Sequence, residues 1–137
     1  MVRYLIAAHG RAAGGIKESL DVLLGASDQV EAFDAYVDER NAEEEIRRRI
    51  EAVGEDDILV MLSDLPGGSV NQIMMRYADR KNTFLITGVS IALAVGLVSG
   101  YTDSVTEEQI REMIGECREM MDLVKPENED CEEEDFF

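Results

Sequence analysis

Residues 59–72 narrow the choice of folds more than any other part of the sequence. Four apolar residues, 59–62, are followed by a serine and by Asp64, and a Pro-Gly-Gly break precedes a new periodic pattern. A short apolar run suits a strand covered on both faces, whereas proline and paired glycines suit a loop. Ser69 stands three residues before Gln72, which is the spacing of a capping box at a helix start. The segment therefore predicts a strand, a loop and a helix in succession.

The predicted loop leads into a helix N-terminus, where backbone N–H groups lack partners and the helix dipole is positive. With the glycine pair and the hydroxyl of Ser69, this helix end predicts an anion site beside Asp64. The only histidine, His9, follows another apolar stretch, residues 2–8. If both stretches form neighbouring parallel strands, their carboxyl ends meet at one edge of the sheet. We therefore expect His9 and Asp64 to meet above the glycine loop.

The rest of the chain alternates between strand and helix patterns. Thr106 and Gln109 form a second capping box, and Gly25 ends the first helical repeat. The expected strands are residues 2–8, 30–37, 58–63 and 83–87, and the expected helices are residues 16–24, 42–53, 70–77, 89–98 and 106–121. In the last helix, the residues expected to face the core are Ile110, Met113, Ile114, Cys117 and Met121. Successive β-α units predict a doubly wound α/β sandwich of three layers, with a mainly parallel central sheet and helices on both faces.

Length and charge limit the classes of partner. The 137 residues suit one domain with a hydrophobic core, which we expect over residues 1–124. The acidic segment 125–137 is expected to be disordered, because it cannot bury enough apolar surface to offset its ordering entropy. The net charge of −17 argues against nucleic acid and anionic membranes as partners. Outside the tail the charge is roughly −10.

Two further patterns bear on location and assembly. Cys117 falls in a helical pattern and Cys131 in the acidic tail, so we expect both to be reduced. The start of the chain lacks a signal-peptide pattern, and the longest apolar run is too short to span a bilayer, so we expect a cytoplasmic location. Residues 89–98 are apolar almost all round, which predicts burial against the sheet or a second subunit and indicates a homodimer.

The chemistry expected of His9 depends on its carboxylate partner. Neutral imidazole is a nucleophile near pH 7, and a carboxylate bound to one ring nitrogen fixes the tautomer and leaves the other nitrogen free. His9 and Asp64 would thus form a phosphohistidine arrangement, with Gly67, Gly68 and Ser69 binding phosphate. Structural roles remain as alternatives: an exposed histidine, an aspartate that caps a turn, and a glycine pair in a tight turn.

Four motifs together resemble a known protein family. They are His9-Gly10 after the first strand, Gly15-Ile16 to Leu23-Leu24-Gly25 in the next helix, Ser63 to Ser69 with Asn71, and Ile86-Thr87-Gly88-Val89. Over residues 1–124 the sequence is similar to the mannose-family IIA component of the bacterial phosphoenolpyruvate-dependent sugar phosphotransferase system. The combination is far more specific than any one motif. Pro66 and Gly96 depart from the family pattern, which often has an aromatic and an acidic residue there.

The resemblance implies a phosphoryl carrier in sugar uptake. His9 would accept a phosphoryl group on Nε2 from the carrier HPr and pass it to a IIB component, whose membrane permease partners import the sugar. Asp64 would orient the imidazole. The family also forms homodimers, and the expected core strand order is 2-1-3-4. No cofactor and no metal ion are expected.

Two other functions stay open on the sequence. A flavodoxin-like module could bind phosphate passively in the glycine loop, or serve assembly, without phosphoryl transfer. A Ser-His-Asp hydrolase could use Ser69, His9 and Asp64, although the sequence has no Gly-x-Ser-x-Gly elbow.

Overall fold

The structure, a computed structural model, describes residues 1–126. Most of the predicted disordered tail, residues 127–137, lies outside the described residues. Within residues 1–126 the elements in chain order are β1 (Val2–His9), α1 (Ala12–Leu24), β2 (Val30–Ala35), α2 (Ala42–Glu51), β3 (Ile58–Ser63), α3 (Ser69–Met75), β4 (Thr83–Thr87), α4 (Ile91–Gly100) and α5 (Glu107–Arg118). None of these helices combines the length and the apolar character needed to cross a bilayer.

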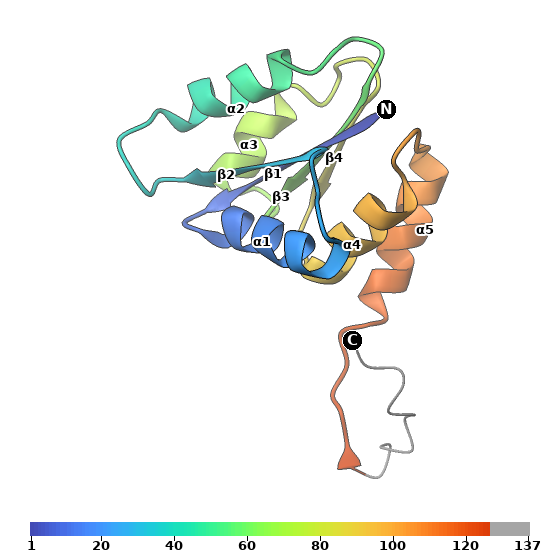
Figure 1. Cartoon of the computed structure of the whole chain (residues 1–137). Helices are drawn as coiled ribbons and strands as arrows, with labels where there is room; N and C mark the ends of the chain where they lie inside the picture. Colours follow the sequence, from blue (N-terminus) through green and yellow to red (C-terminus); the bar gives the residue numbers. More distant parts are fainter. Residues whose placement is uncertain (127–137) are drawn as a thin grey trace.

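The four strands form one parallel sheet in the order β2-β1-β3-β4. Figure 1 shows α2 and α3 on one face of the sheet and α1, α4 and α5 on the other. Strand β1 serves both faces, because side chains alternate along a strand. Tyr4 and Ile6 join the core under α1, α4 and α5, whereas Leu5 and Ala7 join the core under α2 and α3. The predicted three-layer α/β fold and its strand order are confirmed.

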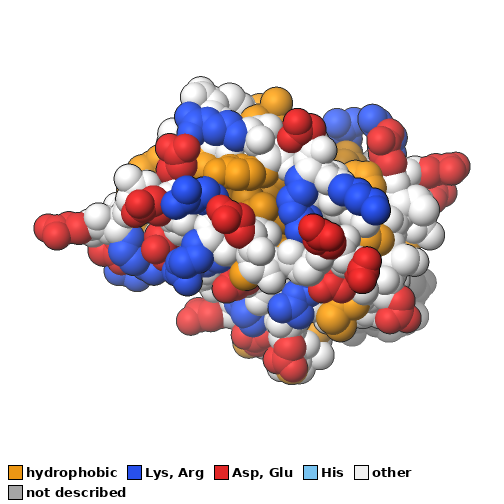
Figure 2. Space-filling model, turned by 90° about the horizontal axis from the view of Figure 1, so that it is seen from above, with side chains coloured by type: hydrophobic (Ala, Val, Ile, Leu, Met, Phe, Trp, Pro, Cys, Tyr) orange, Lys and Arg blue, Asp and Glu red, His pale blue; other side chains and the backbone are white. Residues whose placement is uncertain are grey.

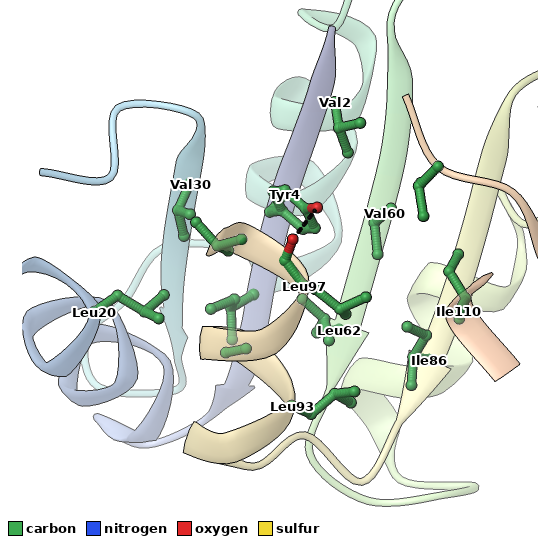
Figure 3. Packing of buried hydrophobic residues seen from close by; sticks show 14 of the residues in the cluster. Val2, Tyr4, Leu20, Val30, Val60, Leu62, Ile86, Leu93, Leu97 and Ile110 are labelled. Atoms are coloured by element: carbon green, nitrogen blue, oxygen red, sulfur yellow. Dashed lines mark hydrogen bonds between the residues drawn. The ribbon is translucent and has the colours of Figure 1, made fainter. Parts of the chain in front are cut away.

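Tyr4 fastens the central strand to helix α4. Its side chain is buried, and its hydroxyl lies 2.9 Å from the carbonyl oxygen of Leu97 and 2.6 Å from that of Tyr101. Figure 3 shows the first of these contacts among the apolar side chains around it. Burial raises the pKa of the Tyr4 hydroxyl, so the group stays a neutral donor. A buried hydroxyl needs such a partner, and this one fixes the end of α4 over the sheet.

The apolar residues of helix α4 pack against other elements of the same chain. It lies against the sheet and between α1 and α5, as predicted for a helix buried on more than one side. At Gly96 a Cβ atom would lie 2.5 Å from Met113 Sδ of α5, so glycine permits the close approach of the two helices. The apolar character of α4 was the main argument from the sequence for a dimer, and packing within the chain now accounts for it. Its buried residues are Leu93, Ala94, Leu97 and Val98.

Two of the sequence predictions about helix ends differ from the structure. Gly68, not Ser69, is the N-cap of α3, and Gln72 Nε2 donates to the carbonyl of Gly67 instead of closing a capping box. The capping box of Thr106 at the start of α5 is confirmed. That helix ends at Arg118, before the apolar pattern does, so Met121 is 91% exposed and the prediction that it faces the core is wrong.

The surface over α2 and α3 carries charges of both signs. Figure 2 shows Lys and Arg side chains interspersed with Asp and Glu on this face, without a large area of one sign. Several of these charges pair within or between the two helices, as Arg47 does with Glu51 and Arg76 with Glu43. Exposed pairs of this kind add little stability, so the face is best described as a solvated surface.

Candidate active site

The candidate site lies where strands β1 and β3 end side by side. His9 is the last residue of β1, and Asp64 directly follows β3. The parallel register pairs Ala7 with Ser63, so Asp64 lies level with Ala8, one residue before His9, and both strands end at the same edge of the sheet. The His9 side chain is 43% exposed and that of Asp64 is 18% exposed. The sheet thus presents an accessible imidazole with a largely covered carboxylate behind it.

One oxygen of Asp64 binds His9 twice. The backbone N–H of His9 donates to Asp64 Oδ2 at 2.9 Å, and His9 Nδ1 lies 2.7 Å from the same oxygen. The backbone N–H of Leu65 donates to the other oxygen, Oδ1, at 2.9 Å. Burial raises the pKa of the Asp64 carboxyl, but the hydrogen bonds from His9 and Leu65 outweigh it and hold the pKa below its usual range. Asp64 is therefore an ionised acceptor at neutral pH.

The ionised carboxylate determines the tautomer of His9. A carboxylate only accepts hydrogen bonds, so Nδ1 must carry the proton. In the neutral ring the other nitrogen, Nε2, then holds a lone pair. Ser69 Oγ lies 3.1 Å from Nε2, at the first residue of α3, and its hydroxyl donates to that lone pair. The structure thus brings His9, Asp64 and Ser69 together around one imidazole.

The glycine pair shapes the loop between Asp64 and Ser69. Gly67 has a φ of +75°, which glycine adopts without strain. At Gly68 a Cβ atom would lie 3.3 Å from the carbonyl oxygen of Leu65 and 3.6 Å from His9 Cε1. The Gly68 N–H donates to that carbonyl of Leu65, so the turn occupies this donor. Because neither Gly67 nor Gly68 carries a side chain, the loop can form a tight turn close to the His9 imidazole.

A second layer of contacts holds the two strand ends in place. Ser63 Oγ donates to Asn71 Oδ1 at 2.6 Å, and both side chains are buried, so β3 and α3 are tied together behind the loop. On the other side, Asp34 Oδ1 accepts from the backbone N–H of Gly14 at 2.7 Å. A Cβ atom at Gly14 would lie 2.8 Å from Asp34 Oδ2, so a side chain there would displace this carboxylate. These contacts fix α3, which begins with Ser69, and α1, which follows His9 in the chain.

Sequence reasoning missed Tyr36, which also contacts this site. Tyr36 follows β2, and its hydroxyl donates to Ser69 Oγ at 2.9 Å. Its ring centroid lies 5.3 Å from that of His9, with the planes tilted by 41°. The predicted strand of residues 30–37 included this tyrosine, whereas the strand ends at Ala35 and Tyr36 has a φ of +66°. The signal available in the sequence was the position of Tyr36 after a strand, because the strands that lead to His9 and Asp64 end in the same way.

Clusters of acidic, cysteine and histidine side chains could hold a metal ion. Among the described residues, no three or more His, Cys, Asp or Glu side chains gather closely enough to hold a metal ion. The groups on the Nε2 side of His9 are instead the hydroxyls of Ser69 and Tyr36, and a hydroxyl can donate to an oxygen of an anion.

The sequence matches the model of a known protein family. The family model described as the PTS system fructose IIA component, EIIA-man, matches residues 3–114, which include His9, Tyr36, Asp64 and Ser69. The chain belongs to the mannose-type IIA family. This family is part of the sugar phosphotransferase system (PTS), so the resemblance seen in the sequence is confirmed.

Solved structures similar to this mannose-type IIA chain share its fold. A protein of Klebsiella pneumoniae assigned as a permease of the phosphoenolpyruvate-dependent sugar phosphotransferase system is 25% identical, with a TM-score of 0.84 over 89% of this chain and 90% of that chain. The PTS IIA protein of the fucose utilization operon of Streptococcus pneumoniae is 23% identical, with a TM-score of 0.79 over 92% and 95%.

A third similar structure has a named sugar specificity. The mannose/sorbose-specific IIA subunit of Enterococcus faecalis is 17% identical to this mannose-type IIA chain, with a TM-score of 0.74 over 90% of this chain and 94% of that chain. None of the curated protein sequences compared with the chain matches it.

Proposed function

We propose that this mannose-type IIA protein is a phosphoryl carrier that accepts a phosphoryl group from HPr on His9 Nε2 and passes it to a IIB component. The observation that carries the proposal is the fixed tautomer of His9. Because Asp64 holds the proton on Nδ1, Nε2 keeps its lone pair, and the His9 side chain that carries it is 43% exposed. An oriented imidazole of this kind needs no further activation to act as a nucleophile.

The transfer step follows from this geometry. The Nε2 lone pair forms a bond to phosphorus while the bond between phosphorus and its donor atom on HPr breaks, in line and on the opposite side. The ring gains a positive charge as the N–P bond forms, and Asp64 Oδ2, 2.7 Å from Nδ1, stabilises that charge. The reverse step delivers the phosphoryl group to the IIB component, and His9 returns to its neutral form.

The glycine loop supplies donors for the phosphoryl oxygens. The Ser69 hydroxyl, which donates to Nε2 before transfer, turns to a phosphoryl oxygen once the lone pair is used. We further propose that the Gly67 N–H binds another oxygen. The N–H of Gly68 is engaged with Leu65 in the free protein, so it contributes only if that turn bond opens. The lack of a side chain at Gly68 leaves room for the phosphoryl group beside the ring.

A hydrolase is the second candidate, because the three side chains also have the distances of a catalytic triad. Ser69 Oγ lies 3.1 Å from Nε2, and Nδ1 lies 2.7 Å from Asp64. In that case Ser69 would be acylated while His9 takes its proton. Membership of the IIA family favours the carrier. A passive phosphate-binding module is the third possibility, and it uses the same loop without any transfer.

One experiment separates these three functions. The protein is incubated with HPr, its upstream kinase and labelled phosphoenolpyruvate, and then with a fluorophosphonate probe that reacts with activated serines. A carrier takes up acid-labile label and transfers it to a IIB component, whereas a hydrolase loses Ser69 to the probe. A passive module does neither. Absence of label would overturn the carrier, and labelling of Ser69 by the probe would then identify a hydrolase.

We also propose that the protein acts as a cytoplasmic homodimer, with residues 1–124 as the carrier domain. A groove of about 540 Å³ runs between the free edge of β4 and α5, and its apolar lining includes Phe84, Ile86 and Ile114. The chain that follows α5 leaves the body of the molecule (Figure 1) with apolar residues exposed to solvent. These residues are Met120, Met121, Leu123 and Val124. Such apolar surfaces are the usual mark of an interface, and a second copy is the occupant we propose.

A further inference from the structure

Tyr36 has a backbone conformation that the sequence does not favour. Its φ of +66° lies in the left-handed region, where a bulky side chain is uncommon, and its side chain is about half exposed. The residue before it, Ala35, is still in β2 and accepts a hydrogen bond from Gly10, the residue after His9. The conformation turns the tyrosine from the sheet edge toward the imidazole. Strained residues of this kind persist where the surrounding structure holds them in place.

The contacts of Tyr36 form a directed chain of hydrogen bonds. Its hydroxyl donates to Ser69 Oγ at 2.9 Å, and Ser69 Oγ lies 3.1 Å from His9 Nε2. Because Tyr36 supplies the proton of the first bond, the Ser69 hydroxyl keeps its own proton for Nε2. The chain continues through the ring to Asp64, where Nδ1 donates over 2.7 Å. Each donor in this sequence points the same way, and such chains strengthen one another.

We propose that Tyr36 is a positioning residue for phosphoryl transfer, which holds the Ser69 hydroxyl so that its proton points at Nε2 and then at the phosphoryl oxygen. This inference rests on the proposed carrier function of His9. The tyrosine acts through Ser69, and not by contact with the reacting atoms. Without the Tyr36 hydroxyl, the Ser69 hydroxyl would rotate freely at the solvent-exposed end of the loop. The Ser69 hydroxyl would then have to be oriented anew in each transfer.

The ring of Tyr36 has a separate effect from its hydroxyl. The ring centroid lies 5.3 Å from that of His9, which is an ordinary aromatic contact and limits rotation of the imidazole from one side. A Tyr36→Phe variant keeps this contact and the backbone conformation but removes the donor to Ser69. It therefore isolates the hydrogen-bond chain from the packing.

The test measures the rate of phosphoryl transfer from HPr in a double-mutant cycle. Tyr36→Phe should lower the rate about fivefold to tenfold, the effect of one ordinary neutral hydrogen bond, with an unchanged melting temperature. In the Ser69→Ala background, Tyr36→Phe should have no further effect. Tyr101→Phe, which removes a tyrosine hydroxyl away from the site, is the matched control and should transfer at the wild-type rate.

A second measurement needs no phosphoryl donor. Nitrogen NMR of His9 reports the hydrogen bond that Nε2 accepts, and loss of that bond moves the Nε2 resonance downfield. Tyr36→Phe should produce such a shift, in the same direction as Ser69→Ala. If the wild-type protein takes no phosphoryl group from HPr, the carrier function fails, whereas this spectrum still decides the role of Tyr36.

Two outcomes would overturn the inference. One is a Tyr36→Phe variant with the wild-type transfer rate and an unmoved Nε2 resonance. This result would mean that the tyrosine lines the site but does not orient the Ser69 hydroxyl. The other is a rate loss of the same size in the Ser69→Ala background, which would mean that the Tyr36 hydroxyl contacts the phosphoryl group itself.

Discussion

The backbone N–H and the ring Nδ1 of His9 both bind one oxygen of Asp64, Oδ2, at 2.9 and 2.7 Å. Two bonds from one residue to one oxygen restrict the rotation of the ring as well as its tautomer. The backbone bond would survive many changes of the imidazole, but the ring bond depends on the charge of the carboxylate. Asp64 therefore has a part in the fold and a proposed part in the chemistry, and the two can be measured separately.

Asp64→Asn should separate them. The amide keeps only one acceptor oxygen. When that oxygen accepts from the backbone N–H of Leu65, the bond maintains the turn and the fold should persist. The amide NH₂ then takes the place of Oδ2 and faces Nδ1, which favours the tautomer with the proton on Nε2 and removes the nucleophile. We expect transfer from HPr to slow by about 10²–10⁴-fold in rapid-quench measurements. A wild-type rate with a lowered melting temperature would show that Asp64 only caps the turn.

The depressed pKa of Asp64 predicts how stability changes with acid. Its carboxyl has a folded-state pKa below the ordinary value of 3.8, so the unfolded chain binds a proton first as pH falls. The stabilisation from the charged carboxylate is complete above that ordinary value and is lost as pH falls through the folded-state pKa. The difference in unfolding free energy between the wild type and Asp64→Asn should therefore be constant near pH 7 and shrink below about pH 4. A constant difference down to pH 2 would contradict this.

Ser69→Ala tests the donor on the phosphate side of His9. Because Gly68 and not Ser69 is the N-cap of α3, this variant loses no capping bond and should fold as well as the wild type. We expect the transfer rate from HPr to fall about 10²-fold, toward the size seen when a preorganised donor is lost. Ser69→Gly should transfer equally slowly and melt lower, since glycine in a helix costs about 0.5–1 kcal/mol. Wild-type rates in both variants would remove Ser69 from the proposed phosphate site.

The dimer proposal predicts a sedimenting mass of about twice 15.3 kDa at micromolar concentration. Leu123→Lys places a charge among the exposed apolar residues after α5 and should shift the protein toward the monomer. Val22→Lys is the control, because Val22 is equally exposed on α1, away from the groove beside β4. A wild-type monomer, or an equal effect of both substitutions, would count against the dimer.

Much of the fold was predictable because short apolar runs and helix caps are local signals. The bounds of β3 and β4 and the capping box of Thr106 agree with the structure. The Ser69 prediction failed for a non-local reason. The same spacing to Gln72 fits a capping box, but the hydroxyl of Ser69 binds His9 and Tyr36 instead. A bond between distant segments overrode the local pattern.

The site was predictable to the extent that it follows from the sheet. Parallel neighbours place His9 and Asp64 at one edge, and the sequence shows where each strand ends. Tyr36 also stands at a strand end, but the predicted strand ran through it to residue 37, and its side chain reaches His9 through a left-handed φ that tyrosine rarely adopts. Likewise, the bond from the Gly68 N–H to Leu65 depends on the conformation of the turn, and a glycine pair is compatible with many turns.

The most direct test of the central claim is the site of phosphorylation. The wild-type protein and a His9→Ala variant are incubated with HPr, its upstream kinase and labelled phosphoenolpyruvate, and the label is located by phosphorus NMR and mass spectrometry. The account predicts one acid-labile phosphoryl group on Nε2 of His9 in the wild type, and none in His9→Ala, which should keep the wild-type fold by circular dichroism. Label retained by His9→Ala, or found on Nδ1 or on Ser69 of the wild type, would contradict it.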